Sequence, residues 1–374
     1  MSDLSCISLF SGGGGLDLGL EAAGFETKFA TDVDSHSCIT LSKNSELSKK
    51  MGKPFLAKAK IHQADVTTLK GEDLLDAVNL KKGELPLLAG GPPCQAFSVF
   101  GKRQGRNDPR GILVYHYLRL IQEIDPKSFI FENVYGLLTI EGGAIFNELV
   151  EKLSNPSPNQ KYKLSVHRLN AVDYGVPQFR DRVFIIGAKE GASIPEIPKV
   201  CSKEPDDLGI IMPWRTVSDG LRDLPSMGRG NLDNHTGRKH SQRIIDRYAG
   251  MMPGERDKHT RINKLDLSRP SYTIIVGSDA GGGKGHIHPI KPREVTPRES
   301  ARMQTFPDWW GFSGTGRHPI RQVGNAVPTL LGAAVGMSVI DQIFNRTPNS
   351  YEEVLDLLNQ NHLFNTNLNV KQSA

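Results

Sequence analysis

Short hydrophobic runs alternate with amphipathic stretches over the first 190 residues of the chain. Runs of this kind predict buried strands. We expect strands at residues 4–10, 25–34, 59–66, 85–91, 128–131, 162–170 and 182–189. Helical patterns lie between them, most clearly at residues 112–124. Strands that alternate with helices predict an α/β fold with a doubly wound, mostly parallel sheet.

The hydrophobic pattern changes after about residue 190. Gly, Pro, Arg and His become frequent and periodicity fades until about residue 298, which predicts a smaller and more irregular domain. Helical patterns return at 297–305 and 329–344, and Ser350 is expected to cap a short final helix. We therefore expect a first domain at 1–190, completed by 321–374, and a second domain at 191–320.

Composition narrows the class of protein. Of the 374 residues, 38% are hydrophobic and 23% are charged, which is typical of a soluble globular chain. The start, MSDLSCISLF, lacks the pattern of a signal peptide, and no run approaches the ~18 apolar residues of a membrane span. The four cysteines form no CxxC pair. We therefore expect a cytoplasmic protein without disulfides or a metal site.

Positive charge is concentrated in one segment. The formal net charge is +5, and residues 227–298 hold 14 Lys or Arg against 7 Asp or Glu, or +7, so the remainder carries −2. Five of the eleven histidines lie in the same segment. A basic block favours a polyanionic partner such as nucleic acid, although an ordinary solvated surface has the same composition.

A glycine-rich turn, FSGGGGLDLG, joins the first strand to the first helix. Glycines at this position let a ligand approach the backbone at a helix N-terminus. Asp32 ends the second strand, 17 residues after Gly15, where an acid commonly binds ribose hydroxyls. Asp65, after the third strand, can accept from an adenine amino group. The pattern indicates a nucleoside cofactor, with NAD and S-adenosylmethionine both open, or else a tight turn without a ligand.

Reactive residue types follow the fourth and fifth strands. Cys94 stands behind two prolines in GGPPCQAFS, and Glu132 follows in FENV. Both are expected at the carboxyl edge of the sheet, where open α/β sheets bind ligands. In QFRDRV, the residues Gln178, Arg180 and Arg182 alternate and therefore share one face. Each motif alone has an ordinary structural explanation, but their combination favours a catalytic site.

Together these motifs resemble the DNA (cytosine-5) methyltransferase family, and in particular the bacterial restriction–modification type. FSGGGGLDLG, DVD, GGPPCQAFS, FENV, QFRDRVF, TPRESARMQTFPD and RQVGNAVP stand in the family's order and span about residues 5 to 340. The resemblance implies a Rossmann-like fold that binds S-adenosyl-L-methionine, with 191–320 as the target-recognition domain. Asp32 stands where family members often carry Glu, and one of the four glycines stands where they often carry a larger residue.

The resemblance also implies a mechanism. Cys94 would add to C6 of a cytosine flipped out of duplex DNA, which makes C5 nucleophilic toward the methyl donor. Glu132 would protonate or bond N3 of the base. Arg182 would bind its O2 and Arg180 would support the site.

The remaining site residues are implied in the same way. The cofactor pocket is expected to contain Phe10, Gly12, Gly13, Gly15, Asp32, Val33, Asp65, Val66, Pro93, Asn325 and Val327. DNA contacts are expected at Ser98, Lys102, Arg103, Arg106, Arg110 and Gln178. We also expect a monomer that pairs functionally with a cognate restriction endonuclease.

Three alternatives remain at this point. A tRNA cytosine-5 methyltransferase would share the fold and the catalytic motifs. A DNA-binding relative without catalysis is disfavoured because the cysteine, the glutamate and both arginines are present. A nicotinamide-dependent oxidoreductase would use the glycine turn but leaves PPCQAFS and GNAVP unexplained.

Overall fold

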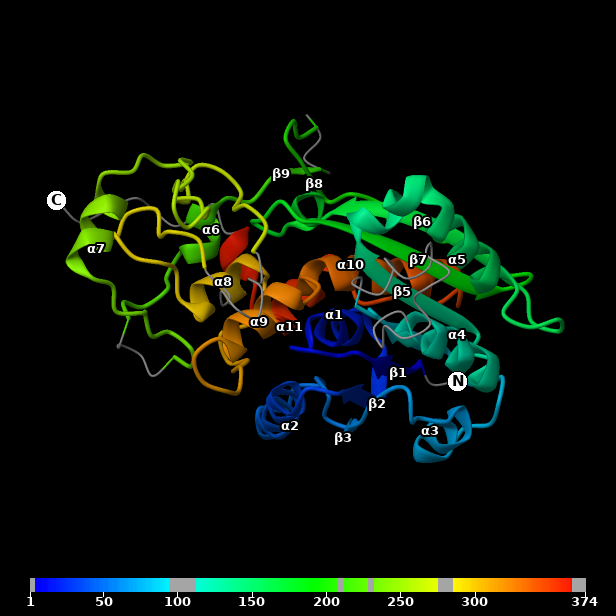
Figure 1. The fold of residues 1–374 in the computed structure, drawn as a ribbon. Coiled ribbons are helices and arrows are strands. Elements are labelled where there is room, and N and C mark those ends of the chain that lie inside the picture. Colours follow the sequence, from blue (N-terminus) through cyan, green and yellow to red (C-terminus); the bar gives the residue numbers. More distant parts are fainter. Residues whose placement is uncertain (1–3, 94–111, 207–210, 228–231, 275–284, 365–374) are drawn as a thin grey trace.

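The computed structural model describes residues 4–93, 112–206, 211–227, 232–274 and 285–364. Its centre is a seven-stranded sheet with the order β3-β2-β1-β4-β5-β7-β6 (Figure 1). The strands are β1 Ser5–Leu9, β2 Glu26–Asp32, β3 Lys60–Gln63, β4 Leu87–Gly90, β5 Ser128–Val134, β6 Tyr162–Asn170 and β7 Asp181–Lys189. The first five strands pair in parallel, whereas β7 pairs antiparallel with both β5 and β6. The predicted mostly parallel sheet is confirmed.

This arrangement brings several chain segments to one edge of the sheet. The parallel strands all end there, so the turns after β1, β2, β4 and β5 are neighbours. Because β7 runs the opposite way, its first residues lie at the same edge. Arg182 pairs with Val134 in the sheet register, two residues beyond Glu132.

Helices cover both faces of the sheet, as a doubly wound fold requires. They are α1 Gly15–Ala23, α2 Ser35–Lys50, α3 Gly71–Ala77, α4 Ile112–Ile124, α5 Ala144–Ser154, α6 Val217–Leu221, α7 Gln242–Ala249, α8 Pro297–Met303, α9 His318–Asn325, α10 Thr329–Gln342 and α11 Tyr351–Leu357, with short 3-10 turns at Tyr135–Leu138, Ile140–Gly143, Ala171–Tyr174 and Asn361–Leu363. One hydrophobic core joins the sheet to α1, α10 and α11, and a second joins the other face to α3, α4 and α5. Successive strand residues alternate between these cores, as Cys6 and Ile7 do.

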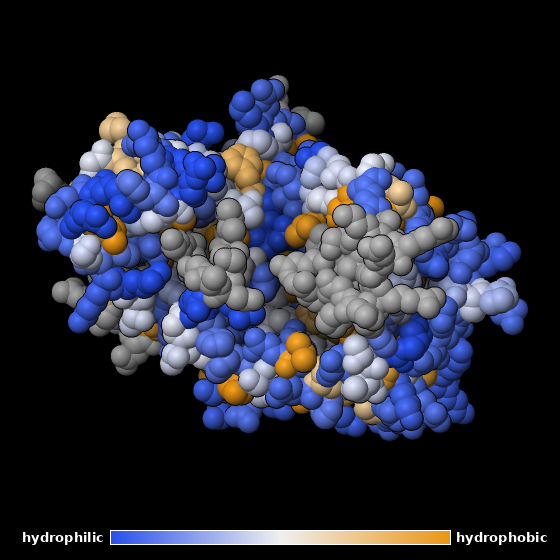
Figure 2. All heavy atoms as spheres, viewed as in Figure 1, coloured by the Kyte–Doolittle hydropathy of each residue, from blue (hydrophilic) through white to orange (hydrophobic). Residues whose placement is uncertain are grey.

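The segment after residue 190 has little regular structure. It contains the two-residue strands β8 Cys201–Ser202 and β9 Met212–Pro213 together with α6 and α7. A separate small core of Tyr248, Met251, Ile262 and Ile287 holds the part around α7 together. This part lies at the left of Figure 1, and Figure 2 shows mostly hydrophilic residues over it.

One stretch has the length and hydropathy of a membrane span. It runs from His318 to Gln342, across α9 and α10, and 89% of its apolar window is buried inside the protein. Such burial is typical of a core helix. Accordingly, α10 packs closely on α1, where a Cβ added at Gly19 would lie 2.5 Å from the Thr329 carbonyl oxygen.

Candidate active site

A cavity of about 1130 Å³ opens at the carboxyl edge of the sheet. Its described lining includes Phe10, Gly12, Gly15, Asp32, Val33, Asp65, Val66, Pro93, Asn325 and Val327 from the predicted cofactor pocket, and also Glu132 and Arg182. The structure therefore brings the glycine turn and the predicted catalytic pair to one cavity. Gly13 and Arg180 stand outside this lining.

The glycine turn is shaped by left-handed backbone conformations. Phe10, Gly12 and Gly14 have φ angles of 57°, 53° and 83°. The turn is fixed to the second strand, because the Gly12 amide donates to Asp32 Oδ2 at 2.8 Å. The Asp34 amide donates to the other oxygen of Asp32 at 2.9 Å. Burial raises the pKa of Asp32, an effect that these two bonds oppose.

The same glycines let distant segments close over the turn. Trp310 Nε1 donates to the Gly13 carbonyl oxygen at 3.0 Å, and a Cβ at Gly14 would lie 2.7 Å from the Trp310 ring. A Cβ at Gly15 would lie 2.1 Å from the Val327 carbonyl oxygen. Gly13 therefore packs behind the cavity wall. The run of glycines reflects close backbone packing as well as access for a ligand.

Glu132 and Arg182 form a buried ion pair. Arg182 Nε lies 2.9 Å from Glu132 Oε1, and the side chains are 10% and 11% exposed respectively. Burial raises the pKa of Glu132, and the positive charges of Arg182 and Arg180 offset only part of this effect. A Cβ at Gly91 would lie 2.6 Å from Glu132 Oε2, so the second glycine of GGPPC leaves room for the carboxylate. A carboxyl group whose pKa is raised can act as a proton donor near neutral pH.

Asn133 connects this pair to the proline turn. Its Nδ2 donates to the Pro92 carbonyl oxygen at 2.9 Å, and both residues are buried. Pro93 lines the cavity, and Cys94 is the next residue in the chain. Cys94 itself lies outside the described residues, as do the predicted DNA contacts Ser98, Lys102, Arg103, Arg106 and Arg110.

Arg180 lies behind the cavity, where it holds the GNAVP segment. Its Nη2 donates to the carbonyl oxygens of Gly324 at 2.6 Å and Ala326 at 2.9 Å, and only 1% of the residue is exposed. This contact supports the two lining residues Asn325 and Val327. The supporting role of Arg180 in the reaction stays a prediction.

Gln178 lies differently from the sequence-based expectation. The side chain has no exposed surface; Nε2 donates to the Met303 carbonyl oxygen at 3.1 Å and Oε1 accepts from the Ile274 amide at 3.0 Å. The predicted DNA contact is not supported by this placement, because both ends of the amide bond within the protein. Gln178 alternates with Arg180 and Arg182 along the chain, but its side chain packs inside the protein.

Two residues that the sequence analysis did not select also belong to the site. Asp17 lines the cavity and has no exposed surface, although it stands inside the glycine motif. Asn133 stands inside FENV. Each of these two residues lies inside a motif that already pointed to the site. The sequence does not show, however, that the side chain is buried or which group it bonds.

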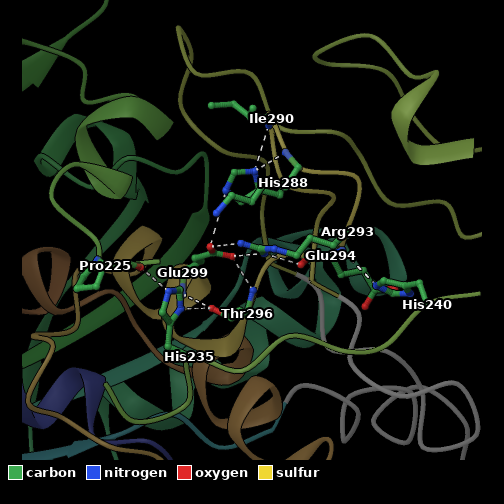
Figure 3. A network of polar contacts seen from close by, with 10 residues as sticks. Pro225, His235, His240, His288, Ile290, Arg293, Glu294, Thr296 and Glu299 are labelled. Carbon is green, nitrogen blue, oxygen red and sulfur yellow. Dashed lines mark hydrogen bonds and ion pairs between the residues drawn. The ribbon is translucent and has the colours of Figure 1, made fainter. Parts of the chain in front are cut away.

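A polar network braces the junction between the irregular part and α8 (Figure 3). Arg293 donates to both oxygens of Glu299, at 2.7 and 2.8 Å, and the Thr296 amide donates to the same carboxylate at 2.8 Å. His235 Nδ1 bonds Thr296 Oγ1 at 2.9 Å. Burial alone would raise the pKa of Glu299, but the bonds from Arg293 and the Thr296 amide reverse the effect, and its pKa lies below the usual range. Burial lowers the pKa of the neighbouring His288 to about 4.

A hairpin of residues 254–264 carries exposed cations on the irregular part. The Gly254 amide donates to the Lys264 carbonyl oxygen at 2.8 Å, and the Asp257 amide donates to that of Ile262 at 2.8 Å. Lys264 Nζ is buried and donates to the carbonyl oxygens of Met251 at 2.8 Å and Tyr248 at 3.2 Å. The cations at the outer surface of the hairpin are Arg256, Lys258 and Arg261.

Within the ranges that the structure describes, no group of three or more His, Cys, Asp or Glu side chains is arranged to hold a metal ion.

Comparisons with known proteins agree with the fold and with the family resemblance. The C-5 cytosine-specific DNA methylase family matches residues 4–341. The type II methyltransferase M.XorII of Xanthomonas oryzae pv. oryzae is 32% identical over 400 residues, covering 95% of this chain and 88% of M.XorII. The type II methyltransferase M1.HphI of Haemophilus parahaemolyticus is 31% identical over 90% of this chain and 87% of its own.

Solved structures of methyltransferases share the fold of this chain. A protein described as a DNA modification methyltransferase, encoded within a prophage in E. coli, has a TM-score of 0.71 and 27% identity, covering 92% of this chain and 100% of that chain. The Dnmt2 methyltransferase of S. pombe shares the fold, with a TM-score of 0.61 and 19% identity over 90% of this chain and 98% of its own. Since the family match spans most of the chain, from β1 into α10, this chain belongs to the C-5 cytosine-specific DNA methylase family.

Proposed function

We propose that this DNA (cytosine-5) methyltransferase transfers a methyl group from S-adenosyl-L-methionine to C5 of a flipped-out cytosine in one specific duplex DNA sequence. Membership of the family and the type II methyltransferase relatives supply the reaction class, the DNA substrate and the need for a methyl donor. The observation that carries the proposal is one cavity shared by the glycine turn, Pro93 and the Glu132–Arg182 pair.

The described cavity lining fits this donor. It contains five acidic side chains, at Asp17, Asp32, Asp34, Asp65 and Glu132, against the two guanidinium groups of Arg182 and Arg321. S-adenosylmethionine carries a sulfonium and an ammonium against one carboxylate, so its net charge complements a negative wall. Asp32 is suited to the ribose hydroxyls and Asp65 to the adenine amino group, and the exposed Val33 offers an apolar contact. When bound, this cofactor supplies an electrophilic methyl group.

The chain's own residues supply the remaining chemistry. The Cys94 thiolate adds to C6 of cytosine while N3 gains a proton from Glu132, which leaves an enamine with electron density at C5. Arg182 pairs with Glu132 and is suited to bind the base at O2. After C5 has gained the methyl group, a base removes the C5 proton, the Cys94–C6 bond breaks with the thiolate as leaving group, and N3 returns its proton to Glu132. The product is 5-methylcytosine and the cysteine is regenerated.

We assign DNA binding to a domain at 191–320. The catalytic domain is formed by 1–190 and completed by 321–374. Arg256, Lys258 and Arg261 on the 254–264 hairpin are exposed and suited to phosphate contacts. The basic segment around Lys102, Arg103, Arg106 and Arg110 is assigned to the DNA backbone next to the flipped base. Flipping costs a few kcal/mol, which such contacts offset.

We further propose that the enzyme acts as a cytoplasmic monomer and modifies the target of a cognate restriction endonuclease. The type II methyltransferases that resemble this chain support the modification role. A single active site is sufficient to act on one flipped base.

Substitution of Cys94 tests the covalent route. Cys94→Ala is expected to abolish methyl transfer while duplex binding and cofactor binding stay within about twofold of wild type. Cys201→Ala, which removes a buried thiol outside the cavity lining, is the matched control and should retain transfer. Near wild-type methylation by Cys94→Ala would overturn the proposed mechanism.

A further inference from the structure

Asp17 is a buried acid in the wall of the cavity whose charge the protein leaves largely uncompensated. It stands in the first turn of α1 and has no exposed surface, yet it lines the cavity. Its Oδ1 accepts a long bond of 3.5 Å from Ser11 Oγ. No group in the described part of the chain donates to its Oδ2. A buried carboxylate oxygen without a donor is costly, and such an atom points to a proton or a ligand.

Within the described residues, the titratable groups coupled to Asp17 do not supply a positive charge. Cys6, Glu21 and Asp32 are the titratable groups coupled to it, and all three are acids. Burial raises the pKa of Asp17 to about 6, despite bonds from Ser8 and Ser11 that oppose the effect. Those two bonds and the N-terminus of α1 favour its ionised form, but none of them carries a full positive charge. At neutral pH a bound cation would therefore gain a strong charge-assisted contact here.

Asp17 and Asp32 are both hydrogen-bonded to the glycine turn. Gly12 bonds Asp32 and the adjacent Ser11 bonds Asp17, so the two acids flank the same turn. If Asp32 receives the ribose, the methionine end of the donor extends along the turn toward α1. That end carries an ammonium group, a strong donor to an unpaired carboxylate oxygen.

We propose that Asp17 binds the α-ammonium group of the methyl donor and thereby fixes the methionine end of the cofactor. The inference rests on the proposed function, because it takes S-adenosylmethionine as the donor. It assigns Asp17 to recognition of the amino-acid end, whereas the residues named above serve the nucleoside, the base and the reaction.

Three probes separate this contact from others in the same cavity. S-adenosylmethionine carries the sulfonium and the amino-acid ammonium and carboxylate, S-adenosylhomocysteine carries the ammonium and carboxylate without the sulfonium, and 5′-methylthioadenosine carries none of these charged groups. Binding of each to full-length wild type, Asp17→Asn and the surface control Asp76→Asn is measured by calorimetry at pH 7.5. Asp17→Asn should weaken the first two probes by about ten- to a hundredfold and the third by less than twofold. Asp76→Asn, on the exposed side of α3, should match wild type for all three.

Each other outcome has a definite meaning. Loss confined to S-adenosylmethionine would assign Asp17 to the sulfonium and overturn the proposal. Equal loss for all three probes, or no loss for any, would also overturn it. Wild type that binds none of the probes would instead refute the proposed cofactor, which is a separate failure.

A pH series on wild type keeps the test independent of the variant's folding. Affinity for S-adenosylhomocysteine should rise as pH increases through about 6 and then level off, because ionised Asp17 is the binding form. The other titratable lining groups, at Asp32, Asp34, Asp65, Glu132 and His318, act on 5′-methylthioadenosine as well. The ratio of the two affinities therefore isolates the amino-acid end, and a ratio that is flat from pH 5 to 7.5 would contradict the assignment.

Discussion

Asn133 Nδ2 donates to the Pro92 carbonyl oxygen at 2.9 Å, so the strand that carries Glu132 also holds the proline turn that precedes Cys94. Glu132 is the residue before Asn133, and Cys94 is the second residue after Pro92. This hydrogen bond fixes Pro92 relative to the strand that carries Glu132, and we expect it to help position Cys94, two residues further along the chain. Positioning errors of about 1 Å are costly in catalysis.

Asn133→Ala should therefore lower turnover more than it lowers binding. We expect kcat to fall by at least about tenfold, while cofactor affinity stays within about twofold and the free energy of unfolding falls by about 1 kcal/mol. Single-turnover methylation and calorimetry measure these quantities. Equal losses in turnover and cofactor affinity would indicate a general loss of structure instead.

Glu132 should give the enzyme an alkaline limb in its pH profile. Because burial raises the pKa of Glu132, the protonated form persists above the usual carboxyl range and is lost as pH rises through the raised value. Glu132→Gln should reduce kcat by about 10² to 10⁴ and remove that limb, with little change in cofactor affinity. The measurement is kcat from pH 6 to 9 at constant ionic strength. An unchanged alkaline limb in the variant would exclude Glu132 as the proton donor.

Gly15→Ala should separate the glycine turn from the segment at Val327. The added Cβ would lie 2.1 Å from the Val327 carbonyl oxygen, so one backbone must move. We expect a loss of about 1–3 kcal/mol in unfolding free energy and a clear loss of cofactor affinity. Gly136→Ala is the matched control, because its Cβ would meet no atom within 4 Å. Wild-type behaviour of Gly15→Ala would show that this close contact is not maintained in solution.

The Arg293–Glu299 pair should be important for stability and remote from the chemistry. Arg293→Met removes the arginine from the buried Glu299 carboxylate, which keeps the bond from the Thr296 amide, and should cost about 3–5 kcal/mol at pH 7. Arg238→Met removes a largely exposed partner of Glu294 and should cost less than about 1 kcal/mol. Urea unfolding measures both.

The lowered pKa of Glu299 also fixes the direction of a pH effect. Its contribution to wild-type stability is present above the unfolded carboxyl pKa of about 4.3 and is lost as pH falls through the lower folded value. Urea unfolding of wild type between pH 3 and 7 follows this loss. Equal losses of unfolding free energy for Arg293→Met and Arg238→Met at pH 7 would contradict the large contribution that we assign to the buried Arg293–Glu299 pair.

The 254–264 hairpin should contribute to DNA affinity through charge. Replacing Arg256, Lys258 and Arg261 with Gln should weaken duplex binding and reduce the slope of log K against log salt by up to about one per lost phosphate contact. Cofactor affinity should not change. Neutralising Lys43, Lys49 and Lys50 on α2, which lies apart from this region in Figure 1, is the control. An unaltered salt slope in the hairpin variant would assign DNA binding to another surface.

Much of the sheet could be predicted because β1, β4, β5 and β7 contain short hydrophobic runs. The helix at Ile112–Ile124 agrees with the prediction, and the last two strands differ from theirs by at most one residue. By contrast, α2 was not identified as a separate helix, because SHSCITLSKNSELSKK is mostly polar. The antiparallel insertion of β7 between β5 and β6 depends on pairing between distant segments, which a local pattern does not encode.

The site was predictable as a set of motifs but not as a set of contacts. The pairing of Glu132 with Arg182 follows from the reversed direction of β7, which only the sheet topology provides. Gln178 shares its alternation with both arginines, yet its surroundings bury it completely. Asp17 is a similar case, because the sequence of the glycine motif does not show that one oxygen of this side chain lacks a hydrogen-bond donor in the described part of the chain.

The most direct test of the central claim is methyl transfer from labelled S-adenosylmethionine to unmodified genomic DNA, followed by single-base mapping of 5-methylcytosine. A parallel reaction contains tRNA in place of DNA. We expect label on DNA alone, at the cytosine of one short recurring sequence. Label on tRNA but not on DNA, or on neither substrate, would contradict the account.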